Sequence, residues 1–318
     1  MTDFKAVHEY PAWYREPGPE GDVVVSSRVR LSRNLSSVVF PHLLREDGLE
    51  RVRRLVEDAL RGSGAAENPV RYDGESLAAD EAALLGEEGL LEPDEGVRGV
   101  SLFPVSRADL WAAVNVKDHL RIFALRGGLD LRRAWTAADE LDSRLETLLD
   151  YAVSPEWGYL SAEIGNLGPA LRASTLLHLP AVVLGGRSDQ IEEIVEAAGH
   201  RIRPFLAGEE APGDMFLLSG SPEIGVSEAE MLEKLEEISR SLLNYEREMR
   251  SLLFEKKKDF LEDQVCRAVG ILERAKFLRC EEAVKLLSLV RMGCAMDCAA
   301  HVDRNAVTAL LFQSRPAH

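Results

Sequence analysis

The hydrophobic pattern of the chain changes once, near Ser227, and this change most constrains the fold. Before it, short apolar runs of strand length alternate with segments whose apolar residues recur every three to four positions. From Ser227 to about Phe312 the pattern is helical throughout. Strands mixed with helices in one part and helices alone in another are typical of an α+β domain joined to a helical one. The sequence therefore predicts an α+β fold up to about residue 225, followed by a helical region.

Several short runs before that point have the length and composition of strands. Residues 100–103, 110–114 and 120–125 are apolar, with turn residues between them, so we expect neighbouring antiparallel strands. Further short strands are predicted near residues 22–25, 158–160 and 215–218, the last inside a long loop at residues 199–226.

Helical periodicity is found between these runs. Helices are predicted at residues 49–60, 75–91, 129–151, 171–178 and 188–198. We expect Pro180 to stop the fourth of them and Ser188 to cap the last. The charged helix that begins near Ser227 is expected to break into shorter helices after about Lys258.

The net charge of −16 limits what the chain can bind. So acidic a protein has no general attraction for nucleic acid or for anionic membranes, and phosphate must be held by locally concentrated arginines. No apolar run approaches the roughly 20 residues that cross a bilayer, and the N-terminal residues lack the pattern of a signal peptide. We therefore expect a cytoplasmic protein that binds neither nucleic acid nor membrane.

Two of the four cysteines, Cys294 and Cys298, stand one helical turn apart. They have the spacing of half a metal site, but His301 is the one further ligand nearby. The pattern favours ordinary thiols over a metal centre.

A set of arginines is the candidate site for phosphate. Arg28 and Arg30 alternate along a strand and therefore point to the same face. Two guanidinium groups held side by side repel each other unless an anion lies between them. Arg121 lies in the run at residues 120–125, and Arg172 opens the helix predicted after a glycine loop, where backbone N–H groups also favour an anion. Arg203 lies in the predicted loop; taken singly, each of the five is typical of a solvated surface residue.

At these residues the chain resembles the ATP:guanido phosphotransferases, and specifically the bacterial protein-arginine kinases. Residues 22–34, with Ser-Ser-Arg-Val-Arg at 26–30, resemble the family's first phosphate strand. Residues 115–122, Asn-Val-Lys-Asp-His-Leu-Arg-Ile, resemble its Asn-Glu-Glu-Asp-His-Leu-Arg-Ile signature, and residues 158–180 resemble its central motif. Residues 262–293 resemble the small helical dimerisation domain of the bacterial enzymes.

The resemblance implies a guanidino-kinase catalytic domain, an antiparallel sheet flanked by helices, at residues 1–245. A small all-helical domain of dimerisation type follows at residues 246–318. The cofactors implied are ATP and Mg²⁺, the metal being held through the phosphates rather than by protein ligands. The residues implied to bind the nucleotide are Ser26, Ser27, Arg28, Val29, Arg30, Arg121, Arg172, Ala173, Ser174 and Arg203.

The acceptor side departs from the family's pattern. Where the family has a catalytic glutamate the chain has Lys117, and where it has a cysteine beside the substrate the chain has Glu163. For the second catalytic glutamate, Gly208-Glu209-Glu210 offers two candidates, and we take Glu209, although its spacing from Arg203 is one residue longer than in the family. A lysine at the first position repels a cationic guanidinium and is no base while protonated.

Two interpretations stay open at this point. Either Glu163 takes over the lost role, with Glu209 opposite, and the chain phosphorylates arginines in proteins; or it is a weak or inactive pseudokinase that binds ATP and regulates a partner. A kinase for free arginine is a third possibility, which Lys117 disfavours. The partners implied are arginine-bearing proteins, a zinc-binding activator, an Hsp100-type protease system and a second copy in a homodimer. The usual C-terminal phosphoarginine-binding stretch is not found.

Overall fold

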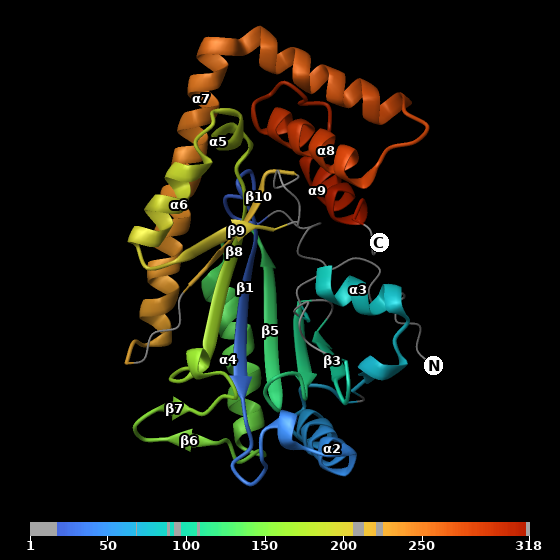
Figure 1. Ribbon diagram of the computed structural model, residues 1–318, viewed down its shortest axis with the longest axis vertical. Helices are drawn as coiled ribbons and strands as arrows, with labels where there is room; N and C mark the ends of the chain where they lie inside the picture. The colour runs from blue at the N-terminus through green and yellow to red at the C-terminus, as the bar shows by residue number, and fades with distance from the viewer. Residues whose placement is uncertain are drawn as a thin grey trace.

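A computed structural model describes residues 18–67, 69–87, 90–91, 97–106, 109–205, 213–220 and 225–315. Its centre is an eight-stranded antiparallel sheet in the order β2-β3-β4-β5-β1-β8-β10-β9 (Figure 1). The strands are β1 (Val24–Arg33), β2 (Tyr72–Asp73), β3 (Ser101–Ser106), β4 (Leu110–Val114), β5 (Leu120–Gly127), β8 (Leu171–His178), β9 (Arg201–Pro204) and β10 (Met215–Ser219). A separate hairpin pairs β6 (Val153–Ser154) with β7 (Gly158–Tyr159).

Helices cover the sheet and continue beyond it. They are α2 (Glu46–Gly62), α3 (Ala79–Glu87), α4 (Leu131–Glu146), α5 (Pro180–Leu184), α6 (Ser188–Ala197), α7 (Glu228–Arg274), α8 (Cys280–Ala295) and α9 (Arg304–Gln313). Short 3₁₀ helices occur at Pro41–Leu43, Gly74–Ser76 and Ile164–Asn166. In the described part of the chain no helix has the length and apolar character needed to cross a membrane.

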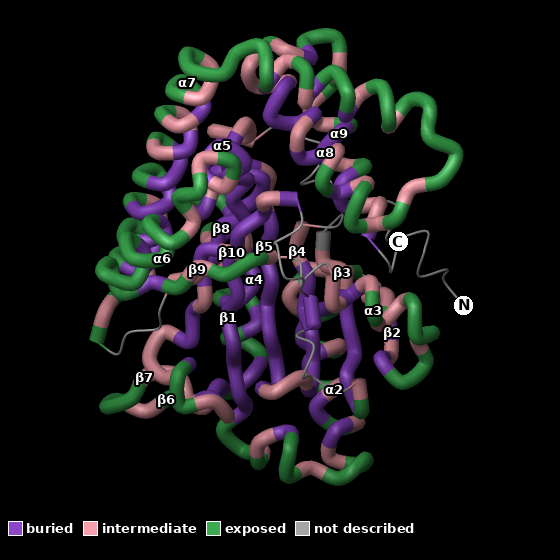
Figure 2. The backbone as a smooth tube through the Cα atoms, turned by 45° about the horizontal axis from the view of Figure 1, so that its top comes forward, coloured by how far each residue is buried: buried purple, intermediate pink, exposed green. Residues whose placement is uncertain are grey.

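Each face of the sheet has its own hydrophobic core, and both cores are buried (Figure 2). Val29 and Leu31 of β1 pack in the core that α4 and the first part of α7 complete. Trp111 and Phe123, on the opposite face, pack in the core completed by α3, α8 and α9. The alternation of the strands thus separates two layers, and the second layer includes the C-terminal helices.

The long helix α7 joins the two regions. It begins with a capping box, in which Ser227 Oγ accepts from the Glu230 backbone N–H and the Glu230 carboxylate accepts from the Ser227 N–H. Lys257 has non-helical backbone angles, so the helix kinks there, which confirms the break expected near Lys258. The domain boundary predicted at residues 245 and 246 lies inside α7 and stays a prediction.

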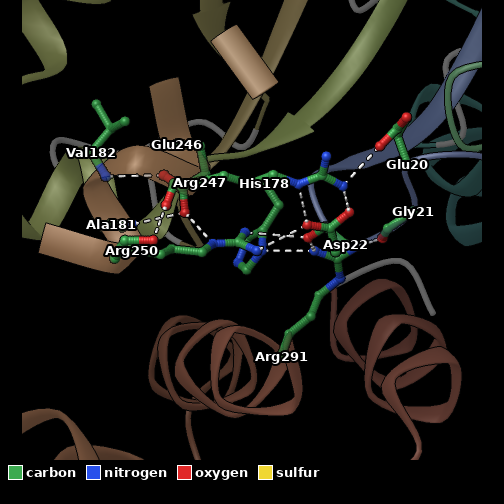
Figure 3. A network of polar contacts seen from close by, with 11 residues as sticks. Glu20, Gly21, Asp22, His178, Ala181, Val182, Glu246, Arg247, Arg250 and Arg291 are labelled. Atoms are coloured by element: carbon green, nitrogen blue, oxygen red, sulfur yellow. Dashed lines mark hydrogen bonds and ion pairs between the residues drawn. The ribbon is translucent and has the colours of Figure 1, made fainter. Parts of the chain in front are cut away.

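Polar contacts fix this helix and α8 to the start of β1 (Figure 3). Arg247 and Arg250 of α7 form ion pairs with Asp22. Arg291 of α8, fully buried, donates to the backbone carbonyls of Gly21 and Asp22 at 2.7 and 3.1 Å. The helical region is therefore attached to the strand that carries Arg28 and Arg30.

The expected α+β fold is confirmed, but some elements differ from their predictions. Residues 171–178 form strand β8 and not a helix, because the segment lies between β1 and β10 with apolar neighbours on both faces, so its run of leucines carries no strand alternation. Pro180 opens helix α5 rather than ending one, and Arg187, not Ser188, is the N-cap of α6. Strand β9, at Arg201–Pro204, lies in a segment predicted to be a loop.

Candidate active site

The register of the central strands brings the arginines to one face. Arg30 of β1 lies directly opposite Arg172 of β8, and Arg28 lies opposite Ser174. Residues directly opposite each other in an antiparallel pair point to the same side of the sheet. Arg172 therefore reaches the site from a strand, and not from the helix N-terminus that its sequence context suggested.

Strand β9 adds two more arginines at the edge of the same face. Ser174 is opposite Ser219 of β10, which in turn is opposite Arg201, and Arg203 follows two residues later. Sequence reasoning missed Arg201. The Arg-Ile-Arg alternation at residues 201–203 matches the Arg-Val-Arg of β1 and would have indicated it, had the segment been assigned to a strand.

These side chains surround a cavity of about 840 Å³. Arg28, Arg30, Arg172, Arg201 and Arg203 line it together with Ser174, and Glu192 and Glu196 of α6 lie on another part of its wall. Five guanidinium groups around one cavity repel each other, and an anion between them removes that cost. Planar guanidinium forks match phosphate oxygens, so the cavity suits a polyphosphate.

Next to this cavity, Lys117 and Glu163 form an ion pair. Lys117 Nζ lies 3.0 Å from Glu163 Oε1, and each side chain is about one-third exposed. The other oxygen, Oε2, accepts from Asn166 Nδ2 at 3.0 Å and lies 3.5 Å from a terminal nitrogen of Arg172. Asn166 also accepts from Arg172 Nε. Glu163 is thus shared between the lysine and the arginine cluster.

A buried carboxylate holds the two loops that carry this pair. Asp118 is fully buried and accepts from Asn34 Nδ2 (2.7 Å), Ser161 Oγ (3.0 Å) and the Ala162 backbone N–H (2.8 Å). These bonds join the turn after β4 to the loop before Glu163. Because Lys117 precedes Asp118 and Glu163 follows Ala162, the contact between them follows from this junction.

The charges around Glu163 set its protonation. Partial burial acts to raise the pKa of this carboxyl, but the hydrogen bond and charge of Lys117, with the charges of Arg172 and Arg30, outweigh it and leave the pKa below its usual value. Glu163 is therefore a carboxylate at neutral pH.

A second, smaller cavity of about 360 Å³ lies on the other side of the pair. Its walls include Pro41, His42, Leu49 and Arg98, and Lys117 and Glu163 line both cavities. The ion pair therefore forms the boundary between the arginine-lined cavity and a second opening.

Comparison with protein families identifies the chain. The family model described as ATP:guanido phosphotransferase, C-terminal catalytic domain, matches residues 71–249. The chain belongs to the ATP:guanido phosphotransferase family. A second model, protein-arginine kinase McsB C-terminal domain, matches residues 258–318.

The similar proteins agree with this assignment. A protein-arginine kinase of Moorella thermoacetica is 36% identical over 315 residues, which cover 96% of this chain and 89% of that protein. A protein-arginine kinase of Syntrophomonas wolfei is also 36% identical, over 318 residues, covering 96% and 88%. Among solved structures, lombricine kinase superposes with a TM-score of 0.62 at 18% identity, covering 78% of this chain and 76% of that one. The duplicated taurocyamine kinase of Schistosoma mansoni gives 0.60 at 21%, covering 72% and 33%. These two structures confirm the guanidino-kinase fold.

Arg121 takes a different place from the other arginines expected to bind the nucleotide. It lies opposite Ser32 in the pairing of β5 with β1, so it shares the face of Arg30. Its side chain is fully buried beside the ring of Phe123, 5.8 Å from the ring centroid, and it is not among the residues that line the large cavity. Its contact with the nucleotide stays a prediction.

The small residues of β1 and β8 that are expected to bind the nucleotide divide between the two faces of the sheet. Ser27 is fully buried; its Oγ donates to the Gly128 carbonyl at 2.8 Å and accepts from the Asp130 N–H at 3.0 Å, which fixes the turn between β5 and α4. The side chains of Val29 and Ala173 pack in the core under α4 and α7. Ser26 is buried on the face of Arg28. Any contact of Ser27 or Val29 with a nucleotide would have to come from the backbone.

Two further expectations concern the acceptor carboxylate and metals. Glu209 lies outside the described residues. Within the described ranges, no group of three His, Cys, Asp or Glu side chains has an arrangement that could hold a metal ion. All four cysteines are free; Cys294 and Cys298 donate to the backbone carbonyls of Val302 and Met296.

Proposed function

We propose that this protein uses ATP to phosphorylate arginine side chains of other proteins. The observation that carries the proposal is the junction of a five-arginine cavity with a carboxylate, Glu163, that a second opening also reaches. Relatives that are about one-third identical over nearly the whole chain are protein-arginine kinases, and the match includes the C-terminal helical region.

The nucleotide would lie on the arginine face. Arg28, Arg30 and Arg172, which line the large cavity, would hold the phosphates, with Arg203 at its edge. Phosphoryl transfer needs little covalent chemistry from the protein, so the rate depends on positioning and charge neutralisation. The arginines would hold the nucleotide, and Mg²⁺ carried with ATP would supply further positive charge against the phosphates.

The acceptor would reach Glu163 through the smaller cavity. A guanidinium nitrogen attacks the γ-phosphorus, a P–N bond forms, the bond from phosphorus to the ADP oxygen breaks, and the guanidinium gives up a proton. Glu163 is the proposed alignment partner and proton acceptor, and Glu209 the proposed second carboxylate. Lys117 must leave Glu163 first, and its departure removes a charge that lowers the Glu163 pKa.

A pseudokinase is the second candidate, and one contact favours it. Lys117 occupies the carboxylate that a substrate guanidinium needs. If that ion pair persists, the chain binds ATP without turnover and acts through a partner. This candidate predicts thermal stabilisation by ATP in the absence of any phosphoarginine.

Phosphoarginine detection by mass spectrometry separates the candidates. The protein is incubated with ATP, Mg²⁺ and an arginine-rich protein, beside Glu163→Gln, Glu209→Gln and Lys117→Glu. We expect phosphoarginine with the wild type and a loss of about 100-fold or more with Glu163→Gln, the scale of a lost general base. Glu156→Gln, an exposed carboxylate on the β6–β7 hairpin, is the matched control. Activity that arises with Lys117→Glu alone would identify the natural chain as a pseudokinase.

Other properties of the family are carried over as proposals. A homodimer built on the C-terminal helices, a zinc-binding activator, an Hsp100-type protease system and a cytoplasmic location follow from the resemblance of residues 262–293 and of the whole chain. Size-exclusion chromatography with light scattering tests the dimer, and a monomer at micromolar concentration would contradict it.

A further inference from the structure

We propose that Glu192 and Glu196 of α6 bind the ribose hydroxyls of the nucleotide, at the end of the large cavity away from Glu163. The proposal rests on the proposed use of ATP and assigns the nucleoside end of the same cavity. It is carried by the position of the two carboxylates, by the order of the strands beneath the cavity and by a buried serine hydroxyl that lines it.

The two glutamates line the cavity from one face of α6. They stand four residues apart, and residues at this spacing are neighbours on a helix surface. Both residues are exposed, and within the described part of the chain neither carboxylate accepts a hydrogen bond or forms an ion pair. Like charges at this spacing destabilise a helix slightly. The pair therefore contributes nothing to the stability of α6, and both carboxylates are available to a ligand.

The strands beneath the cavity place these glutamates and Glu163 at its opposite ends. Strands β1, β8, β10 and β9 are neighbours in that order, and α6 packs against β9, the edge strand (Figure 1). Glu163 lies beside Arg172 of β8, which is opposite Arg30 of β1. Three strand spacings of about 4.8 Å separate β1 from β9, about 14 Å in all. The α6 carboxylates are therefore far from the proposed acceptor.

This separation determines which part of a nucleotide reaches α6. The γ-phosphate must lie near Glu163 for transfer, so the rest of the nucleotide extends towards β9. The three phosphorus atoms of ATP span less than half of the distance between β1 and β9. Carboxylates beside the phosphates would repel them. The ribose, which follows the α-phosphate, instead offers two hydroxyl donors, and carboxylates bind ribose hydroxyls in dinucleotide-binding folds.

A buried hydroxyl between the two ends also indicates a polar ligand. Ser174 of β8 is 4% exposed and lines the cavity, opposite Arg28 on one side and Ser219 of β10 on the other. Neither serine side chain has a hydrogen-bond partner among the described residues. Buried polar groups are normally hydrogen-bonded. The Ser174 hydroxyl is thus available to a nucleotide oxygen that lies between the arginines and α6.

The experiment compares three ligands by isothermal titration calorimetry with Mg²⁺ present: ATP, 2′,3′-dideoxy-ATP and inorganic tripolyphosphate. We expect the wild type to bind ATP about tenfold more tightly than the dideoxy nucleotide, the scale of a hydrogen bond to a charged group. In the double variant Glu192→Ala/Glu196→Ala the two nucleotides should bind within about twofold of each other. Tripolyphosphate should bind to this variant at least as tightly as to the wild type, because two negative charges are removed.

A matched control assigns the preference to the two glutamates. Alanine favours the helix, so the double variant should fold as the wild type does. Glu193→Ala removes an exposed carboxylate from the same helix at a position that is not among the residues lining the cavity. This variant should keep the wild-type preference for ATP.

The outcomes separate this inference from the proposed function. Equal binding of the two nucleotides by the wild type overturns the inference and leaves the kinase activity, measured as phosphoarginine, standing. A preference for ATP that depends on the two glutamates, without phosphoarginine, supports the inference and contradicts the kinase activity. A preference that persists in the double variant would place the ribose elsewhere and overturns the inference, as does a failure of the wild type to bind ATP.

Discussion

Arginines on the two faces of β1 have different surroundings. Arg28 and Arg30 share one face, as their spacing in the sequence predicted, and both line the large cavity. Arg33 faces the other way, is buried, and donates through Nε and a terminal nitrogen to Asp142 at 2.9 and 2.6 Å. Its guanidinium also lies 3.6 Å from the centroid of the Tyr159 ring. One strand therefore supplies two arginines to the wall of the large cavity and a third to an internal carboxylate.

Replacing Arg30 by alanine tests whether the large cavity holds the phosphates of ATP. Arg30 is almost fully buried and lies opposite Arg172. A hydrogen bond to a charged group contributes about 1.5–3 kcal/mol, so Arg30→Ala should weaken ATP binding about 10- to 100-fold. Isothermal titration calorimetry measures the change. Arg54→Ala, at an exposed arginine of α2 paired with Glu50, is the control and should bind ATP as the wild type does; equal affinity in Arg30→Ala would place the phosphates elsewhere.

At the scale of elements, the site depends on strands meeting in a fixed register. β8 lies between β1 and β10 and brings Arg172 and Ser174 beside Arg30 and Arg28. The sequence of β8 reads as helical because its apolar residues need no alternation where both faces are covered. The start of helix α7, by contrast, is visible in the sequence. A serine three residues before a glutamate forms the capping box found in the structure.

Ser227→Ala measures that cap. The hydroxyl accepts a backbone N–H that has no helical partner, so its loss should lower the free energy of unfolding by about 1 kcal/mol. Urea denaturation should give a lower midpoint with an unchanged slope. Ser241→Ala, at an exposed position inside the same helix, removes a hydroxyl without removing a cap and should change the midpoint little. Similar losses in both variants would show that the cap contributes nothing of its own.

At the scale of the molecule, buried polar groups connect the C-terminal helices to the sheet. Arg291 of α8 donates to His178 Nδ1 of β8 at 2.7 Å, and His178 Nε2 lies 2.9 Å from Ser288 Oγ, which donates to Asp214. This order of donors and acceptors requires a neutral His178. Burial, with the charges of Arg291 and Arg250, holds the pKa of His178 well below its ordinary value of 6.5.

The neutral state of His178 predicts how stability responds to acid. Below about pH 6.5 the unfolded chain binds a proton at His178 and the folded chain does not, so stability falls as the pH falls, by up to about 1.4 kcal/mol per pH unit. Burial also lowers the pKa of His119, which acts in the same direction, and it raises the pKa of Glu246 to about 7, which acts in the opposite one. The informative quantity is therefore the difference between wild type and variant.

His178→Gln should reduce the loss of unfolding free energy between pH 6.5 and pH 5, although it lowers stability at neutral pH. Denaturant unfolding across this range measures both. His301→Gln, at an exposed histidine, should keep the wild-type pH dependence. A pH dependence in His178→Gln identical to that of the wild type would mean that His178 does not resist protonation in the folded protein.

From the sequence one can predict the division into an α+β part and a helical part, the three antiparallel strands at residues 100–125, the break in the long helix near Lys258, and the placement of Arg28 and Arg30 on one face. All of these depend on periodicity within a few residues. The tertiary structure alone decided that residues 171–178 form a strand, that Arg201 joins the cluster, that Ser27 turns away from it, and that Lys117 binds Glu163. These contacts join residues that are far apart in the chain, and only the packing of the sheet and the buried junction at Asp118 bring them within bonding distance.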